Sequence, residues 1–343
     1  MSNNAAHRRR TSRKAQAAGA VAAAAVVASG GFLLAGNATA GEEGAAQAGS
    51  SFAPYVDTSL QPSYDLVGNA GKTGVKEYNL GFITGGGGCS PKWGGAQNPS
   101  ENPVAKQIGK LRAKGGDVRI SFGGANGSEL GLSCGSAAEL EKAYGKVIDG
   151  FKLKKADFDI EGAALPDTAA NTKRAKAIAA LQKSHKGLDV HFTLPVLPEG
   201  LTQDGVKLLE NAKQNGVKVS QVNLMAMDYG PNYKGDMGTY ATKAATASQK
   251  QVKKALGLGS DAAAWKAVGL TPMIGVNDVK GEVFKTDDAQ QVKKFADQKG
   301  LGGLSMWSAT RDKACPGGSK DQADPTCSGI EQGAGAFTKA FTG

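Results

Sequence analysis

Histidine is scarce in this chain of 343 residues, which contains only three histidines. Two of them, His185 and His191, lie beyond residue 40. So few imidazole groups give little support to a Ser-His-Asp triad or to a metal site built on histidine. We therefore expect acid–base chemistry to rest on carboxylates and tyrosine, and we expect neither a metal nor a cofactor.

Acidic residues are absent from residues 1–40, whereas five Arg and Lys residues lie at 8–14. An Ala-, Val-, Gly- and Leu-rich run follows at 15–36, and Ala-Thr-Ala at 38–40 forms a small-x-small cleavage site. This layout predicts a secretory signal peptide at 1–40 and a secreted, extracellular protein. A membrane anchor is the alternative, because the run is about long enough to span a bilayer. Its Ala and Gly content favours removal, after which we expect no membrane association.

Concentrated basic charge is also absent from the remainder of the chain. Without the five basic residues at 8–14, the formal net charge falls from +10 to +5. The remaining lysines are scattered beside acidic neighbours, whereas nucleic-acid binding needs a basic patch. We therefore expect no nucleic-acid partner.

Cysteine is limited to four residues, none of them in a Cys-x-x-Cys spacing, which speaks against a zinc site. An even number of cysteines in the exported part predicts two disulfides. Three pairings are possible. The Pro-, Gly- and Asp-rich loop between Cys315 and Cys327 favours a local bridge there, which leaves Cys89 paired with Cys134.

After a flexible leader at 41–51, short stretches with strand character alternate with longer helical patterns. Strands are expected at 52–57, 77–84, 117–124, 156–162, 188–196, 219–229, 267–276 and 301–309. Helices are expected between several of them, at 104–114, 137–151, 169–184, 204–215, 240–256 and 288–299.

This alternation predicts an α/β protein with a parallel sheet. Eight strands favour a closed (β/α)8 TIM barrel as a single domain at 52–343. An open doubly wound sheet is the alternative, although no glycine-rich nucleotide fingerprint follows the first strand. In a barrel of this kind, the chemistry lies at the C-terminal ends of the strands.

The most informative stretch is 156–162, where Asp157, Asp159 and Glu161 alternate with Phe158 and Ile160. On a β-strand the three carboxylates would project from one face, roughly 6–7 Å apart along the backbone. Like charges this close in a sheltered site raise the pKa of at least one of them. A carboxylic acid still protonated near neutral pH is what glycoside hydrolysis requires. A solvated polar face on an edge strand is the simpler alternative.

Four motifs in order resemble those of glycoside hydrolase family 18, the chitinases and their relatives. The family's Asp-x-x-Asp-x-Asp-x-Glu motif is matched by the three acids at 157–161, and Ser-x-Gly-Gly is matched at 121–124. The Met-x-Tyr-Asp region is similar to 225–229, and the eighth-strand tryptophan is similar to Trp307. The resemblance extends over 52–309, and the runs at 121–127 and 157–162 resemble the bacterial secreted branch.

Two departures from the family pattern are present. Lys154 occupies the position of the first motif aspartate, a supporting residue in the family. In the sixth strand, the family tyrosine precedes the aspartate, whereas here Met227 precedes Asp228 and Tyr229 follows it.

The resemblance implies a retaining, substrate-assisted mechanism in which the 2-acetamido group of the sugar is the nucleophile. Glu161 would be the general acid and base, and Asp159 would hydrogen-bond the acetamide N–H. Asp157 would share a proton with Asp159, Tyr229 would orient the acetamide, and Asp228 would contact the sugar or the acetamide oxygen.

The resemblance and the strand positions also suggest residues around the substrate. Trp307 is expected to form a floor for a sugar ring, with ordinary core packing as the alternative. Trp93 is either an exposed platform for a sugar or a packed loop anchor. The remaining expected residues are barrel-lining methionines, a supporting donor, two closely packed glycines and an amide: Met225, Met227, Ser121, Gly123, Gly124 and Asn126.

The implied function is that of a secreted chitinase, with chitin or N-acetylglucosamine oligosaccharides as its partner and a monomer as its expected state. An endo-β-N-acetylglucosaminidase that acts on glycoprotein glycans would use the same core chemistry. A catalytically inactive chitin-binding lectin is a third reading, but such proteins typically lose the motif glutamate, and Glu161 is present. Endo or exo action stays open, and no separate chitin-binding module is visible.

Overall fold

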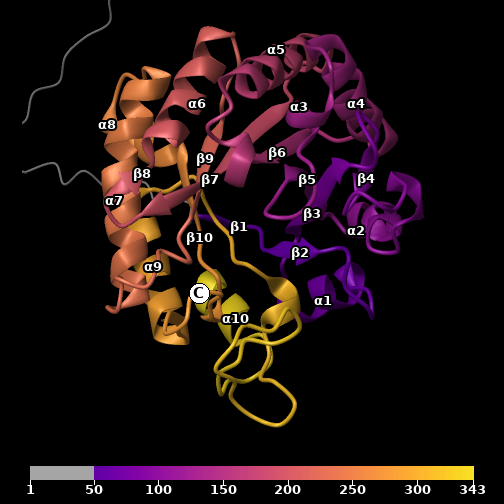
Figure 1. Cartoon of the computed structure of the whole chain (residues 1–343). Coiled ribbons are helices and arrows are strands. Elements are labelled where there is room, and N and C mark those ends of the chain that lie inside the picture. The colour runs from indigo at the N-terminus through magenta and orange to yellow at the C-terminus, as the bar shows by residue number, and fades with distance from the viewer. Residues whose placement is uncertain (1–49) are drawn as a thin grey trace, which may run out of the picture. The chain divides into compact units, whose positions relative to one another are not determined.

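The computed structural model describes residues 50–343, so the expected signal peptide at 1–40 lies outside the described residues. A parallel sheet curves on itself, and helices cover its outer face (Figure 1). Its neighbouring strands are, in order, β1 (Ser51–Phe52), β13 (Gly303–Leu304), β10 (Val268–Thr271), β9 (Gln221–Met225), β7 (Asp189–Leu197), β6 (Lys155–Asp159), β5 (Asp117–Gly123), β3 (Glu77–Gly85) and β2 (Tyr55–Asp57).

The sheet closes through the segment 51–57, which contains both β1 and β2. Ser51 of β1 pairs with Gly303 of β13, whereas Tyr55 of β2 pairs with Asn79 of β3. Between them, the Tyr55 N–H donates to the Met306 carbonyl at 3.0 Å. One continuous segment therefore lies between the last and second strands, which confirms the (β/α)8 barrel over the open sheet.

Several short strands and 3-10 turns lie outside the main order of barrel strands. β4 (Pro91–Trp93) and β8 (Gly200–Leu201) pair antiparallel with β3 and β7, and β11 (Gly275–Val276) pairs with β12 (Val283–Phe284). Four 3-10 turns are η1 (Pro99–Glu101), η2 (Ala105–Gln107), η3 (Gly162–Ala164) and η4 (Ala309–Arg311).

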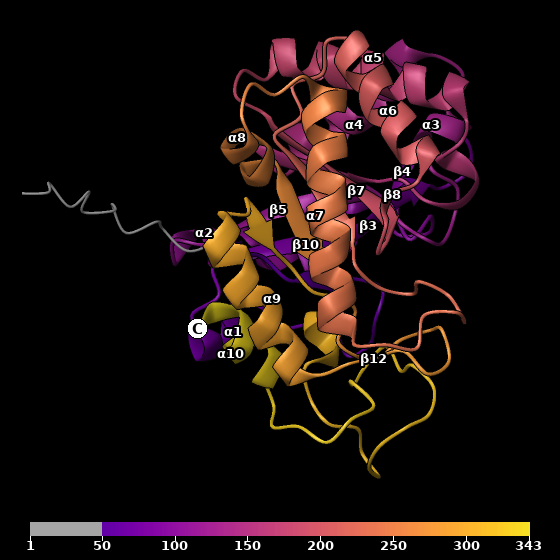
Figure 2. The ribbon, with the colours of Figure 1, turned by 90° about the vertical axis from the view of Figure 1, so that its left-hand side faces the viewer.

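Ten α-helices lie in the described residues, and α7 packs along α9 on the outside of the sheet (Figure 2). All six expected helices are present, and α1, α3, α8 and α10 are additional. Within 50–343, no helix has the length and apolar character required to cross a membrane. The helices are α1 (Leu66–Thr73), α2 (Ile108–Ala113), α3 (Leu130–Ser133), α4 (Ala137–Gly150), α5 (Thr168–Ser184), α6 (Gln203–Gln214), α7 (Met237–Leu256), α8 (Asp261–Lys266), α9 (Thr286–Lys299) and α10 (Ala336–Thr342).

Side-chain alternation on neighbouring strands decides which groups reach the barrel interior. Phe122 of β5, Phe158 of β6 and Phe192 of β7 are at most 1% exposed, and Tyr144 of α4 packs edge-on against the first two rings. Because these aromatic rings face the helices, the acids that alternate with Phe158 project into the barrel. Burial of the rings thus fixes the direction of the carboxylates.

Two disulfides and one ion pair fasten the loops around the barrel. Cys89 is bonded to Cys134, and Cys315 is bonded to Cys327, as the sequence favoured. The guanidinium of Arg174 on α5 lies 2.6 Å from the carboxylate of Glu129, and both side chains are buried. Burial alone would raise the pKa of Glu129, but the charge of Arg174, together with hydrogen bonds from Arg174, Gly131 and Tyr144, holds that pKa below its usual value.

Candidate active site

Asp157 lies on β6 inside the barrel, only 1% exposed, and three hydroxyl groups donate to its carboxylate. One oxygen accepts from Tyr55 at 2.8 Å and from Ser121 at 2.6 Å, and the other accepts from Thr193 at 2.8 Å. Burial first, and then the charges of Asp157 and Asp159, hold the pKa of Tyr55 well above 10, so its hydroxyl keeps its proton. Ser121 is therefore a donor to an acid, as expected.

Asp159 ends β6 and is 4% exposed. Its Oδ1 atom is buried without a hydrogen-bond partner among the described residues. Burial raises the pKa of Asp159 well above its usual value, and the charges of Glu161 and Asp157 raise it further. A hydrogen bond links the Asp159 and Glu161 carboxyls, so the pair holds a proton at neutral pH.

Glu161 lies beyond the end of β6, but its backbone stays extended, with φ −130° and ψ 175°. The Ile160 N–H still donates to the Thr193 carbonyl at 3.0 Å, so the alternation continues past the strand and brings Glu161 to the side of Asp159. Burial raises the pKa of Glu161 to about 7, with the Asp159 hydrogen bond opposing and the charge of Asp228 adding to the rise. A carboxyl with this pKa both gives and takes a proton near neutral pH.

A pocket of about 260 Å³ opens over Asp159 and Glu161. It lies at the C-terminal ends of the strands, as expected for a barrel. Among the residues expected from the sequence, the structure brings five others to this pocket: Asn126, Met225, Met227, Asp228 and Trp307.

An aromatic surface forms one side of this pocket. The Trp307 ring lies 5.5 Å from the Phe82 ring with 27° between their planes, and 6.1 Å from the Tyr55 ring. The peptide bonds Gly81–Phe82 and Trp307–Ser308 are cis. A partly exposed tryptophan beside a pocket presents the flat face that a sugar ring stacks on.

Asp228 follows β9 in a left-handed conformation with φ 49°. Its carboxylate accepts from the Val279 N–H at 3.0 Å, which ties the pocket to the 277–282 loop. Burial raises the pKa of Asp228, the Val279 hydrogen bond opposes this, and the charge of Asp278 adds to it. The pocket thus contains two further acids, Asp228 and Asp278, besides Asp159 and Glu161.

Gly123 and Gly124 allow the close packing that the sequence suggested. Both have left-handed φ values, 108° and 85°. A Cβ atom at Gly123 would lie 2.0 Å from the Asp159 carbonyl oxygen, and one at Gly124 would lie 2.7 Å from the Phe82 ring. Any side chain at these positions would displace groups of the site.

The structure does not bring Tyr229 to the pocket, which corrects its expected contact with the substrate. Its ring packs against Tyr233 and Tyr240 at 5.8 and 5.7 Å, and its side chain is 5% exposed. The reason lies in the backbone, because the Met227 N–H bonds to the Met225 carbonyl and the strand alternation ends there.

Trp93 is a packed loop anchor and not an exposed platform. It is 3% exposed, its indole N–H donates to the Pro99 carbonyl at 3.1 Å, and its ring lies 6.3 Å from that of Phe151. Its expected role in substrate binding is corrected accordingly.

Sequence reasoning missed Tyr55, Thr193 and Phe82, which all line the pocket. Tyr55 and Thr193 lie on expected strands, and their interior-facing positions were the available signal. Neither belongs to a recognisable motif, so only the closed barrel shows that they meet Asp157.

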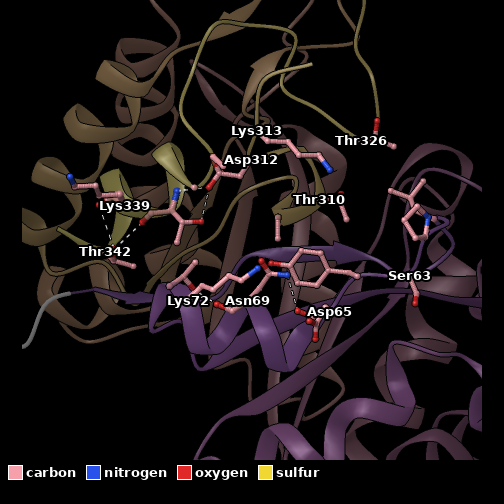
Figure 3. Close-up of a pocket in the computed structure, with 18 of the residues that line it drawn as sticks. Ser63, Asp65, Asn69, Lys72, Thr310, Asp312, Lys313, Thr326, Lys339 and Thr342 are labelled. Atoms are coloured by element: carbon pink, nitrogen blue, oxygen red, sulfur yellow. Dashed lines mark hydrogen bonds between the residues drawn. The ribbon is translucent and has the colours of Figure 1, made fainter. Parts of the chain in front are cut away.

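A larger hollow of about 660 Å³ lies outside the barrel, between α1, α10 and the segment 309–313 (Figure 3). Lys72 and Lys313 extend over it from opposite sides. The Asp312 carboxylate accepts from Thr338 and so caps α10. The residues that line this hollow include no pair of neighbouring acids with raised pKa values, so we assign the chemistry to the smaller pocket. Across residues 50–343, no group of His, Cys, Asp and Glu could hold a metal ion.

No family model matches the sequence. The chain is 38% identical over 281 residues to a probable bifunctional chitinase/lysozyme of Escherichia coli, and 37% identical over 273 residues to endochitinase 11 of Metarhizium anisopliae. These matches cover 78% and 76% of this chain. They cover 31% and 52% of the relatives, so the chain spans about a third and about half of their lengths.

The matches to two solved structures cover a larger share of both chains. The catalytic domain of a hyperthermophilic chitinase from Pyrococcus furiosus has a TM-score of 0.77 and 36% identity, covering 85% of this chain and 94% of that chain. Mutants of active domain 2 of a Pyrococcus furiosus chitinase, complexed with chito-oligosaccharides, have a TM-score of 0.78 and 35% identity, covering 85% and 93%. A GH18 chitinase from Pseudoalteromonas aurantia, at 19% identity, a TM-score of 0.53 and coverage of 76% and 94%, shares the fold.

Proposed function

Because the chain belongs to glycoside hydrolase family 18, we propose that it is a chitinase that cleaves β-1,4 linkages between N-acetylglucosamine residues with retention. The observation that carries this proposal is the pair of neighbouring acids Asp159 and Glu161 beside a pocket, with the pKa of Asp159 raised and that of Glu161 at about 7. Such a pair supplies the protonated acid that a glycosidic oxygen needs when its bond to carbon breaks.

In the first step, Glu161 donates its proton to the glycosidic oxygen, and the leaving sugar departs as an alcohol. The acetamide carbonyl oxygen of the bound sugar attacks C1 and forms an oxazolinium ion. Asp159 accepts a hydrogen bond from the acetamide N–H and places negative charge beside this cation. Asp157 is held by its three hydroxyl donors, and its charge favours the protonated form of its neighbour Asp159, so the two acids share the control of that proton.

In the second step, Glu161 takes a proton from water, and the water oxygen attacks C1 from the side the leaving group occupied. The acetamide is released intact and the configuration at C1 is retained. Trp307 would support the sugar ring during both steps, and Asp228 would contact its polar groups.

The chain is also proposed to be secreted as a monomer, after removal of residues 1–40. The two disulfides support an oxidising environment. Sequencing the amino terminus of protein recovered from the culture medium should give Gly41 as the first residue.

The test of the activity is incubation of purified protein with chitin hexamers, followed by chromatography of the products and proton NMR of the new reducing ends. We expect shorter oligomers with the β-anomer appearing first. Release of glycans from a glycoprotein with no action on hexamers would favour the endo-β-N-acetylglucosaminidase. Binding of intact hexamers without cleavage would favour a lectin.

A further inference from the structure

An asparagine behind Asp157 contacts two of its three donors. Asn223 lies on β9, is 5% exposed, and donates from its amide nitrogen to Thr193 Oγ1 at 3.0 Å and to the Tyr55 hydroxyl at 3.3 Å. Its amide oxygen accepts from the hydroxyl of Thr271, on β10, at 2.8 Å. Within residues 50–343, neither Asn223 nor Thr271 has a side-chain hydrogen bond to an acid.

The hydroxyls of Tyr55 and Thr193 have two choices of acceptor. Their oxygens lie 2.8 Å apart, so either hydroxyl can donate to the other instead of to Asp157. Each hydroxyl has one hydrogen and two lone pairs, so an amide nitrogen that donates to both oxygens uses one lone pair of each and does not compete for their hydrogens. With Asn223 in this orientation, both hydrogens are free to point at Asp157.

The orientation of the amide therefore decides how many donors Asp157 has. If the amide turned over, its oxygen would draw the Tyr55 and Thr193 hydrogens away and leave Asp157 with Ser121 alone. On the opposite side of this layer, a hollow of about 590 Å³ at the N-terminal ends of the strands borders Asn223, Tyr55 and Asp157. Because the oxygen and nitrogen of an amide are nearly the same size, hydrogen bonds and not packing decide which way the amide points. Thr271 supplies the donor that its oxygen requires.

We propose that Asn223 and Thr271 are positioning residues, which direct the hydroxyls of Tyr55 and Thr193 toward Asp157 and so support the acid pair. The inference rests on the proposed function, because it assigns both residues to the same reaction.

The first test compares Thr271→Val, Thr271→Ser and the control Ser248→Ala in hydrolysis of chitin hexamers. Ser248 is a fully buried hydroxyl of α7 without a hydrogen-bond partner among the described residues, so its removal should leave activity unchanged. Thr271→Val keeps the shape but loses the donor, and we expect kcat to fall on the order of tenfold while KM changes little. Thr271→Ser should restore most of kcat. An unchanged kcat for Thr271→Val, or an equally low one for Thr271→Ser, would overturn the proposal.

A double-mutant cycle tests the connection itself. If Thr271 acts through Asn223 on Tyr55, then Tyr55→Phe removes part of what Thr271→Val can affect, and the double variant loses less than the product of the single losses. Independent, multiplicative losses would contradict the proposed connection. Thermal unfolding of each variant shows whether its native fold is kept.

Neutron diffraction of the deuterium-exchanged wild-type protein locates the deuterons of these hydrogen bonds and does not depend on an activity assay. We expect deuterons of Tyr55 and Thr193 directed at Asp157 and the Asn223 amide nitrogen directed at both oxygens. An amide oxygen facing them would refute the inference even if the enzyme is active. Inactive wild-type protein with the expected deuteron positions would instead refute the proposed function and leave the network as described.

Discussion

The Tyr55 hydroxyl donates a 2.8 Å hydrogen bond to the Asp157 carboxylate across the interior of the barrel, although 102 positions separate the two residues. Tyr55 lies on β2 and Asp157 on β6, so the segment 51–57 at the start of the barrel supplies a donor to the acids of β6. The site therefore forms only when the barrel is complete. Substitutions of Tyr55 should alter the environment of Asp159 and Glu161.

Replacing Glu161 with glutamine should remove the general acid and lower kcat on chitin hexamers by at least about two orders of magnitude. The amide has nearly the same shape, so fold and oligomer binding should persist. Circular dichroism and calorimetric titration with hexamers provide these controls. Activity equal to that of the wild type would show that another group donates the proton.

The pH dependence of the rate should follow the pKa of Glu161, which is about 7. The acid must be protonated to cleave the bond, so kcat/KM should fall as the pH rises through about 7. The measurement is the rate on a chromogenic chitin dimer substrate from pH 4 to 9. A rate that stays level to pH 9 would contradict the assigned role.

The same group should make the stability of the protein depend on pH. Its folded pKa of about 7 lies above the usual 4.5, so the folded state binds a proton that the unfolded state releases between these values. This group's contribution therefore declines as the pH rises from about 5 to 7. The melting temperature of Glu161→Gln, compared with that of the wild type, should gain several degrees between pH 5 and pH 8. If the melting temperatures of the two proteins changed with pH in the same way, the pKa of the Glu161 carboxyl would not be raised in the folded state.

Replacing Asp159 with asparagine should lower kcat by about 10²-fold or more, because the neutral amide does not balance the oxazolinium charge. Wild-type protein should also fail to cleave glucose oligomers, which lack the acetamide nucleophile. The two results are read together by product chromatography. Cleavage of the glucose oligomers would exclude the substrate-assisted route.

Tyr229→Phe and Tyr55→Phe make a matched pair that tests which tyrosine serves the site. Tyr229 packs among other tyrosines and does not line the pocket, so its hydroxyl should be dispensable for kcat. Tyr55→Phe removes a donor to Asp157 and should lower kcat on the order of tenfold. Equal losses in the two variants would show that Tyr229 reaches the substrate.

Much of the barrel follows from local pattern, because alternating burial and amphipathic spacing are properties of short segments. All eight expected strands and six expected helices are present. The ends of the strands are less predictable: the fourth ends at Asp159 and the sixth at Met225, several residues before their expected limits. Hydrogen bonds to neighbouring strands decide those ends, and they depend on residues distant in sequence.

The same distinction separates the site residues that sequence reasoning found from those it missed. Glu161 lies on the side of Asp159 that the alternation predicts, because an extended backbone continues the alternation beyond the strand. Tyr229 was misplaced because the turn after Met225 breaks that alternation. Tyr55 was missed because its hydrogen bond to Asp157 forms only when the segment 51–57 takes its place in the closed barrel.

The segment 51–57 limits how far the chain can be shortened from its amino terminus. It bonds to β13 on one side and β3 on the other. A chain trimmed past Asp57 would leave unpaired amides and carbonyls on β13 and β3, which are templates for strand addition between molecules. Such a fragment should be recovered as insoluble assemblies, whereas trimming that stops before Ser51 should leave a well-behaved particle.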